Sequence, residues 1–130
     1  MQRSFPCLSP AQSIVLLRWA IAIVFFMHAL VRIINGTVTE FAQFMNEKGF
    51  VYGTAIVWIL TVFEIGGSIL LALDFFTKKL CAGFIVILIT GIIIIHASLG
   101  WFVGEHGTGG VEYSFILIIA LMTVAAHSKN

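Results

Sequence analysis

Ionisable side chains interrupt or edge the apolar stretches of this 130-residue chain, and their types are those that carry protons and bind polar ligands. They are His28, Arg32, Glu64, His96 and Glu112. Histidine and glutamate exchange protons when burial or a nearby charge moves their pKa, and arginine supplies such a charge. A charge at the centre of a membrane span costs about 2.5 to 3.5 kcal/mol on insertion scales, so it usually faces a bundle interior or a cavity. We therefore expect these residues to form a polar site or to fix helix packing.

The composition indicates a membrane protein. Hydrophobic residues make up 60% of the chain, charged residues only 10%, and the mean hydropathy is +1.08, whereas soluble domains are about 25% charged. The net charge of +1 gives no reason to expect nucleic acid as a partner. Cys7 and Cys81 lack C-x-x-C spacing, which argues against a disulfide framework and a thiol redox motif, and we predict no metal site.

Four apolar segments predict an all-α integral membrane four-helix bundle that forms one domain over residues 1–130. The segments are Ser13 to Ile34, Gly53 to Leu73, Leu80 to Trp101 and Val111 to Ala126. The first three reach the roughly 20 residues that a bilayer core requires. The fourth would extend only about 24 Å. It either crosses a thinned bilayer or starts below the membrane surface.

A short amphipathic helix is expected between spans 1 and 2. Thr37 and Glu40 have capping-box spacing, and Gly49 is suited to end the helix. Its apolar face would hold Val38, Phe41, Phe44 and Met45. We expect this helix to lie flat on the outer membrane interface, with a lid over the bundle as the alternative.

Basic residues predict the orientation, because they concentrate on the cytoplasmic side of membrane proteins. One side of the predicted bundle collects Arg3, Lys78, Lys79 and Lys129, and the other has only Lys48 beside three glutamates, one of them Glu105. The termini are therefore predicted to be cytoplasmic. This topology puts His28, Arg32, His96 and Glu112 in the outer half of the bundle, with Glu64 just below them.

The surroundings of these residues favour one shared pocket. Thr61, Gly67 and Ser68 give Glu64 a small, polar helix face. Before the fourth span, GEHGTGG contains Gly107, Gly109 and Gly110, which allow backbone to approach a ligand closely. Arg18 lies toward the cytoplasmic end, where it serves packing or extends to the interface.

Several sequence segments resemble the DoxX family of small four-helix bacterial membrane proteins over nearly the whole chain. They are LLRWAIAIVFFMHALVRI, FEIGGSILLALDFFTKKLCAG and GTGGVEYSFILIIALM. The chain departs from the family pattern at Ala29 and Asp74, where glycine is common, and at Arg32, where lysine is common. The resemblance implies a bacterial cytoplasmic (inner) membrane protein. It implies a candidate ligand site at His28, Arg32, Glu64, His96, Gly110, Glu112 and Tyr113.

The family takes its name from the small subunit of an archaeal quinone-linked oxidoreductase that acts on thiosulfate, and some members are associated with oxidant or thiol stress. The first hypothesis is thus a redox component whose outer pocket binds a quinone. His28 or His96 would hydrogen-bond a carbonyl, Glu64 or Glu112 would relay the proton, and a protein partner would supply electrons. Glu64 and His96 are the candidate catalytic residues.

Three alternatives stay open at this point. His28 and His96 are a potential pair of axial haem ligands. The chain is equally suited to be a non-catalytic membrane subunit, a chaperone or a small transport component, in which buried charges specify helix packing. A proton or ion pathway is the third, and a homo-oligomer is compatible with each of them.

Overall fold

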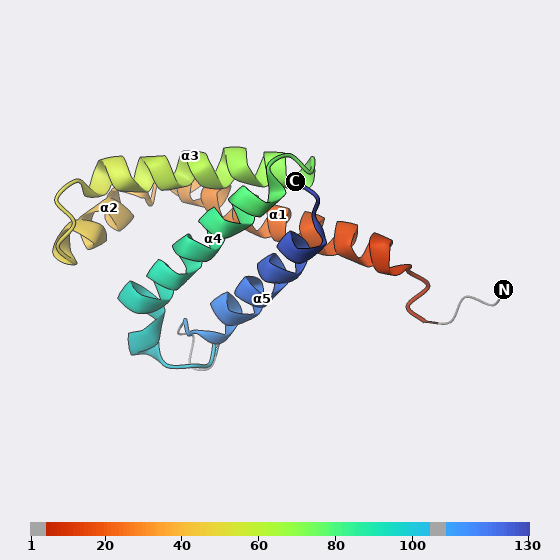
Figure 1. Ribbon diagram of the computed structural model, residues 1–130. Helices are drawn as coiled ribbons and strands as arrows, with labels where there is room; N and C mark the ends of the chain where they lie inside the picture. The colour runs from red at the N-terminus through yellow and green to blue at the C-terminus, as the bar shows by residue number, and fades with distance from the viewer. Residues whose placement is uncertain (1–4, 105–108) are drawn as a thin grey trace.

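The computed structural model describes residues 5–104 and 109–130, and every regular element in them is helical (Figure 1). The elements are α1 (Pro10–Ile34), α2 (Val38–Glu47), α3 (Gly53–Ala72), α4 (Thr77–Gly91), a π-helical turn η1 (Ile92–His96), a 3₁₀ turn η2 (Ala97–Leu99) and α5 (Glu112–His127). Three helical stretches are long and apolar enough to cross a membrane, namely Pro10–Ile34, Gly53–Ala72 and Thr77–Leu99. The predicted all-α, multi-pass membrane architecture is confirmed, with α5 as a shorter apolar helix.

The first span begins at Pro10, three residues before the predicted start at Ser13. Ser9 caps it, because its side chain accepts the Gln12 backbone N–H at 3.2 Å. The Gln12 side chain accepts the Ser9 N–H in return, at 2.9 Å. This capping box, with proline at the first helical position, extends the helix over residues too polar for a hydropathy criterion to include.

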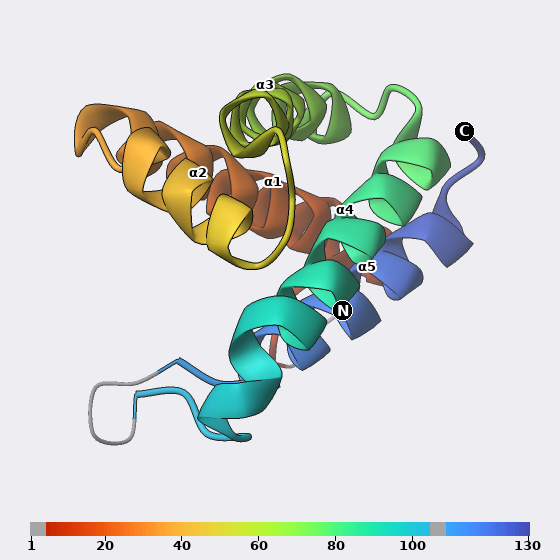
Figure 2. The same ribbon diagram turned by 90° about the vertical axis from the view of Figure 1, so that its left-hand side faces the viewer.

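The helices form two pairs that diverge toward one end of the molecule. Helix α1 packs against α3 and α5, and α4 packs against α5. Figures 1 and 2 both show the start of α5 apart from α2. At the other end, the C terminus lies beside the connection between α3 and α4 (Figure 1).

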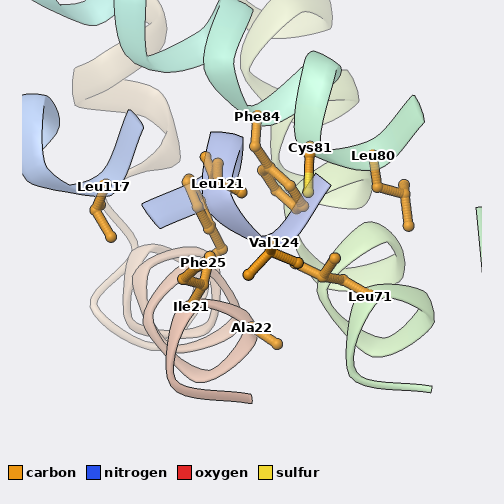
Figure 3. Packing of buried hydrophobic residues seen from close by; sticks show 10 residues of the cluster. All are labelled: Ile21, Ala22, Phe25, Leu71, Leu80, Cys81, Phe84, Leu117, Leu121 and Val124. Carbon is orange, nitrogen blue, oxygen red and sulfur yellow. The ribbon is translucent and has the colours of Figure 1, made fainter. Parts of the chain in front are cut away.

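All four long helices contribute to the main hydrophobic core (Figure 3). Its centre is Phe84 of α4, which is fully buried and stacks on Phe25 of α1 with ring centroids 4.1 Å apart. Gly67 of α3 faces the same ring, and a Cβ there would lie 3.2 Å from Phe84 Cζ. The absence of a side chain at Gly67 therefore lets α3 and α4 approach closely.

A second, smaller cluster joins α2 to α3. Its buried members are Val38, Ala42, Met45 and Val57. Phe41, Phe44 and Ile94 of η1 pack against them, so the predicted apolar face of α2 is turned toward the bundle. These contacts correspond to the lid alternative rather than to the preferred interfacial position.

The predicted capping box of α2 is wrong. Thr37 makes no side-chain cap, because its hydroxyl donates instead to the carbonyl of Arg32 at 3.3 Å. Gly49 does follow the helix end and has a positive φ of 99°, which a residue with a side chain rarely adopts.

Candidate functional site

A buried ion pair joins α1 to α3. Arg32 Nη1 donates to Glu64 Oε2 at 2.7 Å and to Thr61 Oγ1 at 2.8 Å. Only 8% of the Arg32 side chain and 3% of the Glu64 side chain are exposed. The Thr61 hydroxyl donates in turn to the Val57 carbonyl at 2.7 Å, so its hydrogen is also used. The ion-pair partner of Glu64 is therefore Arg32, which lies on the neighbouring helix.

Local sequence explains how this pair is positioned. Thr61 and Glu64 are three residues apart and therefore lie on one face of α3. Arg32 is in the last turn of α1, where the helix dipole favours a cation. Phe41 of α2 covers the guanidinium, whose Cζ lies 5.2 Å from the ring centroid. This cation–π contact is absent from the sequence expectation, although Phe41 had been assigned to the apolar face of α2.

His28 and His96 lie near this pair. His28 is exposed on α1, one turn before Arg32, and it interacts electrostatically with Glu64, Arg32 and His96. His96 is half-buried at the end of η1. The structure thus brings together four of the predicted site residues, His28, Arg32, Glu64 and His96.

The imidazole of His96 has an unfilled hydrogen-bonding position. Its Nδ1 atom is buried and has no hydrogen-bond partner among the residues that the structure describes. A Cβ on Gly109 would lie 3.6 Å from Nδ1, and one on Gly91 would lie 3.9 Å from Nε2. Both ring nitrogens therefore face glycines. Single π-helical turns inside α-helices often mark functional sites, because they displace side chains from the regular helical face.

The remaining predicted residues lie at the start of α5. Glu112 Oε1 accepts the Val103 N–H at 2.7 Å, and the Glu112 N–H donates to the Trp101 carbonyl at 2.9 Å. Gly110 is required here, because any Cβ would collide with the Phe102 carbonyl. Tyr113 is exposed. These contacts use the Glu112 carboxylate to hold the preceding loop, and Gly107 lies outside the described residues.

A shallow cavity of about 430 Å³ borders Glu112 and Tyr113, together with Val103 and Ile116. Figures 1 and 2 place this end of α5 away from α2. The other predicted site residues do not line this cavity, but Gly109, just before α5, lies against the His96 ring.

The family comparison bears on the residues around the Arg32–Glu64 pair. The DoxX family model matches residues 13–97, which is well over half of the chain. The chain belongs to the DoxX family. The matched region contains His28, Arg32, Glu64 and His96 but not α5. No curated protein and no solved structure matches the chain.

In this DoxX protein the second arginine of α1 also has an acidic partner. Arg18 Nη1 lies 2.9 Å from Asp74 Oδ1, in the turn after α3. Asp74 has a positive φ of 64° and also accepts the Thr77 hydroxyl at 2.6 Å. Sequence reasoning noted Asp74 as a departure from the family glycine but did not pair it with Arg18. The signal was an acidic residue at the same end of the bundle as an unpaired arginine.

Ser68 has a local role, since its hydroxyl donates to the Ile65 carbonyl at 2.8 Å. No group of three or more potential metal ligands occurs within the described ranges, 5–104 and 109–130. Haem ligation by His28 and His96 stays a prediction, and neither cavity described here is lined by these histidines.

Proposed function

We propose that this DoxX protein is the quinone-binding subunit of a redox complex in the membrane, with the quinone held beside His96. The observation that carries the proposal is the buried Nδ1 of His96, which has no partner among the described residues. An unsatisfied buried polar atom costs about 1 to 3 kcal/mol, and a ligand that supplies the missing partner removes this cost. A quinone carbonyl is such a partner for an imidazole N–H.

Reduction of a quinone consumes two electrons and two protons, so the site needs proton donors near the carbonyl oxygens. His96 and His28 are the nearest candidates, and the buried Glu64 with its Arg32 partner interacts electrostatically with His28. In this scheme Glu64 passes protons to the histidines, and Arg32 holds the Glu64 side chain in place through their ion pair. A partner protein supplies the electrons, because the chain has no haem, flavin or iron–sulfur motif.

The test begins with the full-length protein purified with its native lipids. Mass spectrometry of the extracted small molecules and redox difference spectra should detect a bound quinone. A short-chain ubiquinone analogue should bind about tenfold more weakly to His96→Ala, because a hydrogen bond to the carbonyl is lost. His127→Ala is the matched control, since this histidine lies at the far end of α5 with its Nδ1 2.9 Å from the Thr123 carbonyl. Equal affinity of both variants for the analogue would contradict the proposal.

A second candidate function is a non-catalytic subunit in which the ion pair only fixes helix packing. The observation that favours it is the enclosure of Arg32 by Glu64, Thr61 and Phe41, which come from α2 and α3. Glu64→Gln separates the two. It should lower quinone occupancy or turnover if Glu64 serves the quinone site, and only stability if the pair serves packing.

A further inference from the structure

A polar cavity lies at the opposite end of the molecule from His96. Its volume is about 320 Å³, and it is enclosed by the start of α1, the turn between α3 and α4, and the end of α5 with the residues that follow. Figure 1 shows the C terminus beside this turn. The polar side chains that line it belong to Arg18, Asp74, Thr77 and the four residues from His127 to Asn130.

The C-terminal residues build one wall of this cavity. The Asn130 side-chain amide donates to the Asp74 carbonyl at 2.9 Å, and the Lys78 backbone N–H donates to the Asn130 carbonyl at 2.9 Å. Thr77 donates to the Asp74 carboxylate. These groups satisfy one another, so they shape the wall.

The cationic side chains of the wall have fewer hydrogen-bond partners than these groups. Arg18 Nη1 contacts Asp74, but its Nε is buried without a hydrogen-bond partner in the part of the chain that the structure describes. Lys129 adds a second positive charge at the exposed rim. Against these two cations the lining has the Asp74 carboxylate, which already pairs with Arg18, and the backbone oxygen of Asn130. The cavity therefore combines two cationic side chains with a guanidinium Nε–H that lacks an acceptor among the described residues.

A tryptophan beside the cavity indicates the level of the membrane at which the cavity lies. Trp19, next to Arg18 in the chain, is half-exposed, and its indole N–H donates to the Ala72 carbonyl at 3.2 Å. Tryptophan in this amphipathic position is typical of the level of lipid headgroups in membrane proteins. A phosphate group at this level lies beside the planar guanidinium of Arg18 and the ammonium of Lys129. Proteins use both types of side chain to bind phosphate.

We propose that this cavity binds a phosphate group that carries net negative charge, either in the headgroup of an anionic phospholipid or as free phosphate. The Arg18 guanidinium supplies directed hydrogen bonds, and Lys129 supplies the second charge. Asp74 orients Arg18 but also competes with the anion for it. The site is independent of the proposed quinone site, because no lining residue is shared.

Native mass spectrometry of the full-length protein in detergent tests the lipid source, with phosphatidylglycerol as the probe and zwitterionic phosphatidylcholine as the control lipid. Calorimetry with inorganic phosphate tests the free-anion source. We expect one phosphatidylglycerol retained per chain, or saturable phosphate binding, and about tenfold weaker binding in Lys129→Ala and Arg18→Lys. Lys48→Ala is the control, because this lysine lies beyond α2 with its ammonium over the Phe44 ring.

Asp74→Asn provides a test that loss of folding does not imitate. Asparagine keeps an oxygen that accepts from Arg18 and Thr77 but removes the competing charge, so binding should tighten several-fold. Binding of phosphate without phosphatidylglycerol would support the proposal and identify the free anion as the source. Equal retention of both lipids with no effect of Lys129→Ala would overturn it, as would the absence of binding by both probes.

Discussion

The two arginines of α1 have the same type of partner but different surroundings. Arg32 pairs with Glu64 where both side chains are almost completely buried, whereas Arg18 pairs with Asp74, whose side chain is 43% exposed. Since α1 and α3 run antiparallel, Arg32 at the end of α1 meets the middle of α3, whereas Arg18 nearer the start of α1 meets the turn after α3. One pair is enclosed by protein and the other borders a cavity. Arg32 is thus held by protein groups on all the sides described above, whereas Arg18 keeps an Nε–H without an acceptor beside a cavity.

The energetic consequence of this difference is large. Breaking a buried ion pair by removing one partner leaves an uncompensated charge and typically costs about 3 to 5 kcal/mol. Breaking an exposed pair costs about 0 to 1 kcal/mol, because water solvates the charge that remains. The Arg18–Asp74 pair is nearer this case on its acidic side, since 43% of the Asp74 side chain but only 14% of the Arg18 side chain is exposed. The free energy of unfolding of variants at both sites measures this difference.

The largest effect is expected from Glu64→Leu. Arg32 would remain buried without a counter-charge, and the free energy of unfolding should fall by about 3 to 5 kcal/mol. Unfolding of the purified protein in detergent, followed by circular dichroism, measures the change. The double variant Arg32→Met/Glu64→Leu should recover most of it, because no charge is left buried. A stable single variant would show that water reaches Arg32.

Thr61→Val should cost about 1.5 to 3 kcal/mol, the range for a hydrogen bond to a charged group. Valine has nearly the same shape but cannot accept from Arg32 Nη1. Ser68→Ala is the control on the same helix, since the Ser68 hydroxyl donates to the Ile65 carbonyl within α3. Equal stability of the two variants would mean that Thr61 contributes nothing to holding Arg32.

Phe41→Leu should cost about 0.5 to 2 kcal/mol through the lost cation–π contact with Arg32. Leucine keeps an apolar side chain in the α2 cluster. The diagnostic measurement is a double-mutant cycle with Arg32→Met, which should reveal coupling between the two residues. Additive effects would indicate that α2 covers Arg32 without stabilising its charge.

The smallest effect is expected from Asp74→Asn, with a loss of at most about 1 kcal/mol. The same unfolding assay as for Glu64→Leu makes the two ion pairs directly comparable. A loss as large as that of Glu64→Leu would show that the Arg18 site behaves as buried, and the contrast between the pairs would disappear.

Much of the fold follows from residue type and spacing. The apolar lengths of the spans and the shortness of the fourth helix need no tertiary information, because a bilayer fixes the length of helix that crosses it. The grouping of His28, Arg32, Glu64 and His96 was also predictable, since residues on inward faces at similar depth must meet in a small bundle. Neither the cap at Ser9 nor the ring of Phe41 over Arg32 follows from hydropathy.

The sequence by itself determined that this chain is a helical membrane protein and that its charged residues need partners. Only the tertiary structure decided which partners they have. The sequence offers several acidic residues as partners for Arg32, and the packing of α1 against α3 places it beside Glu64. Glu112 was expected to join the same pocket, and in the structure its carboxylate accepts the Val103 N–H of the preceding loop. The physical reason is that the spacing of residues determines on which face of its helix a side chain lies. The angle and position at which two helices cross determine which residues that face contacts.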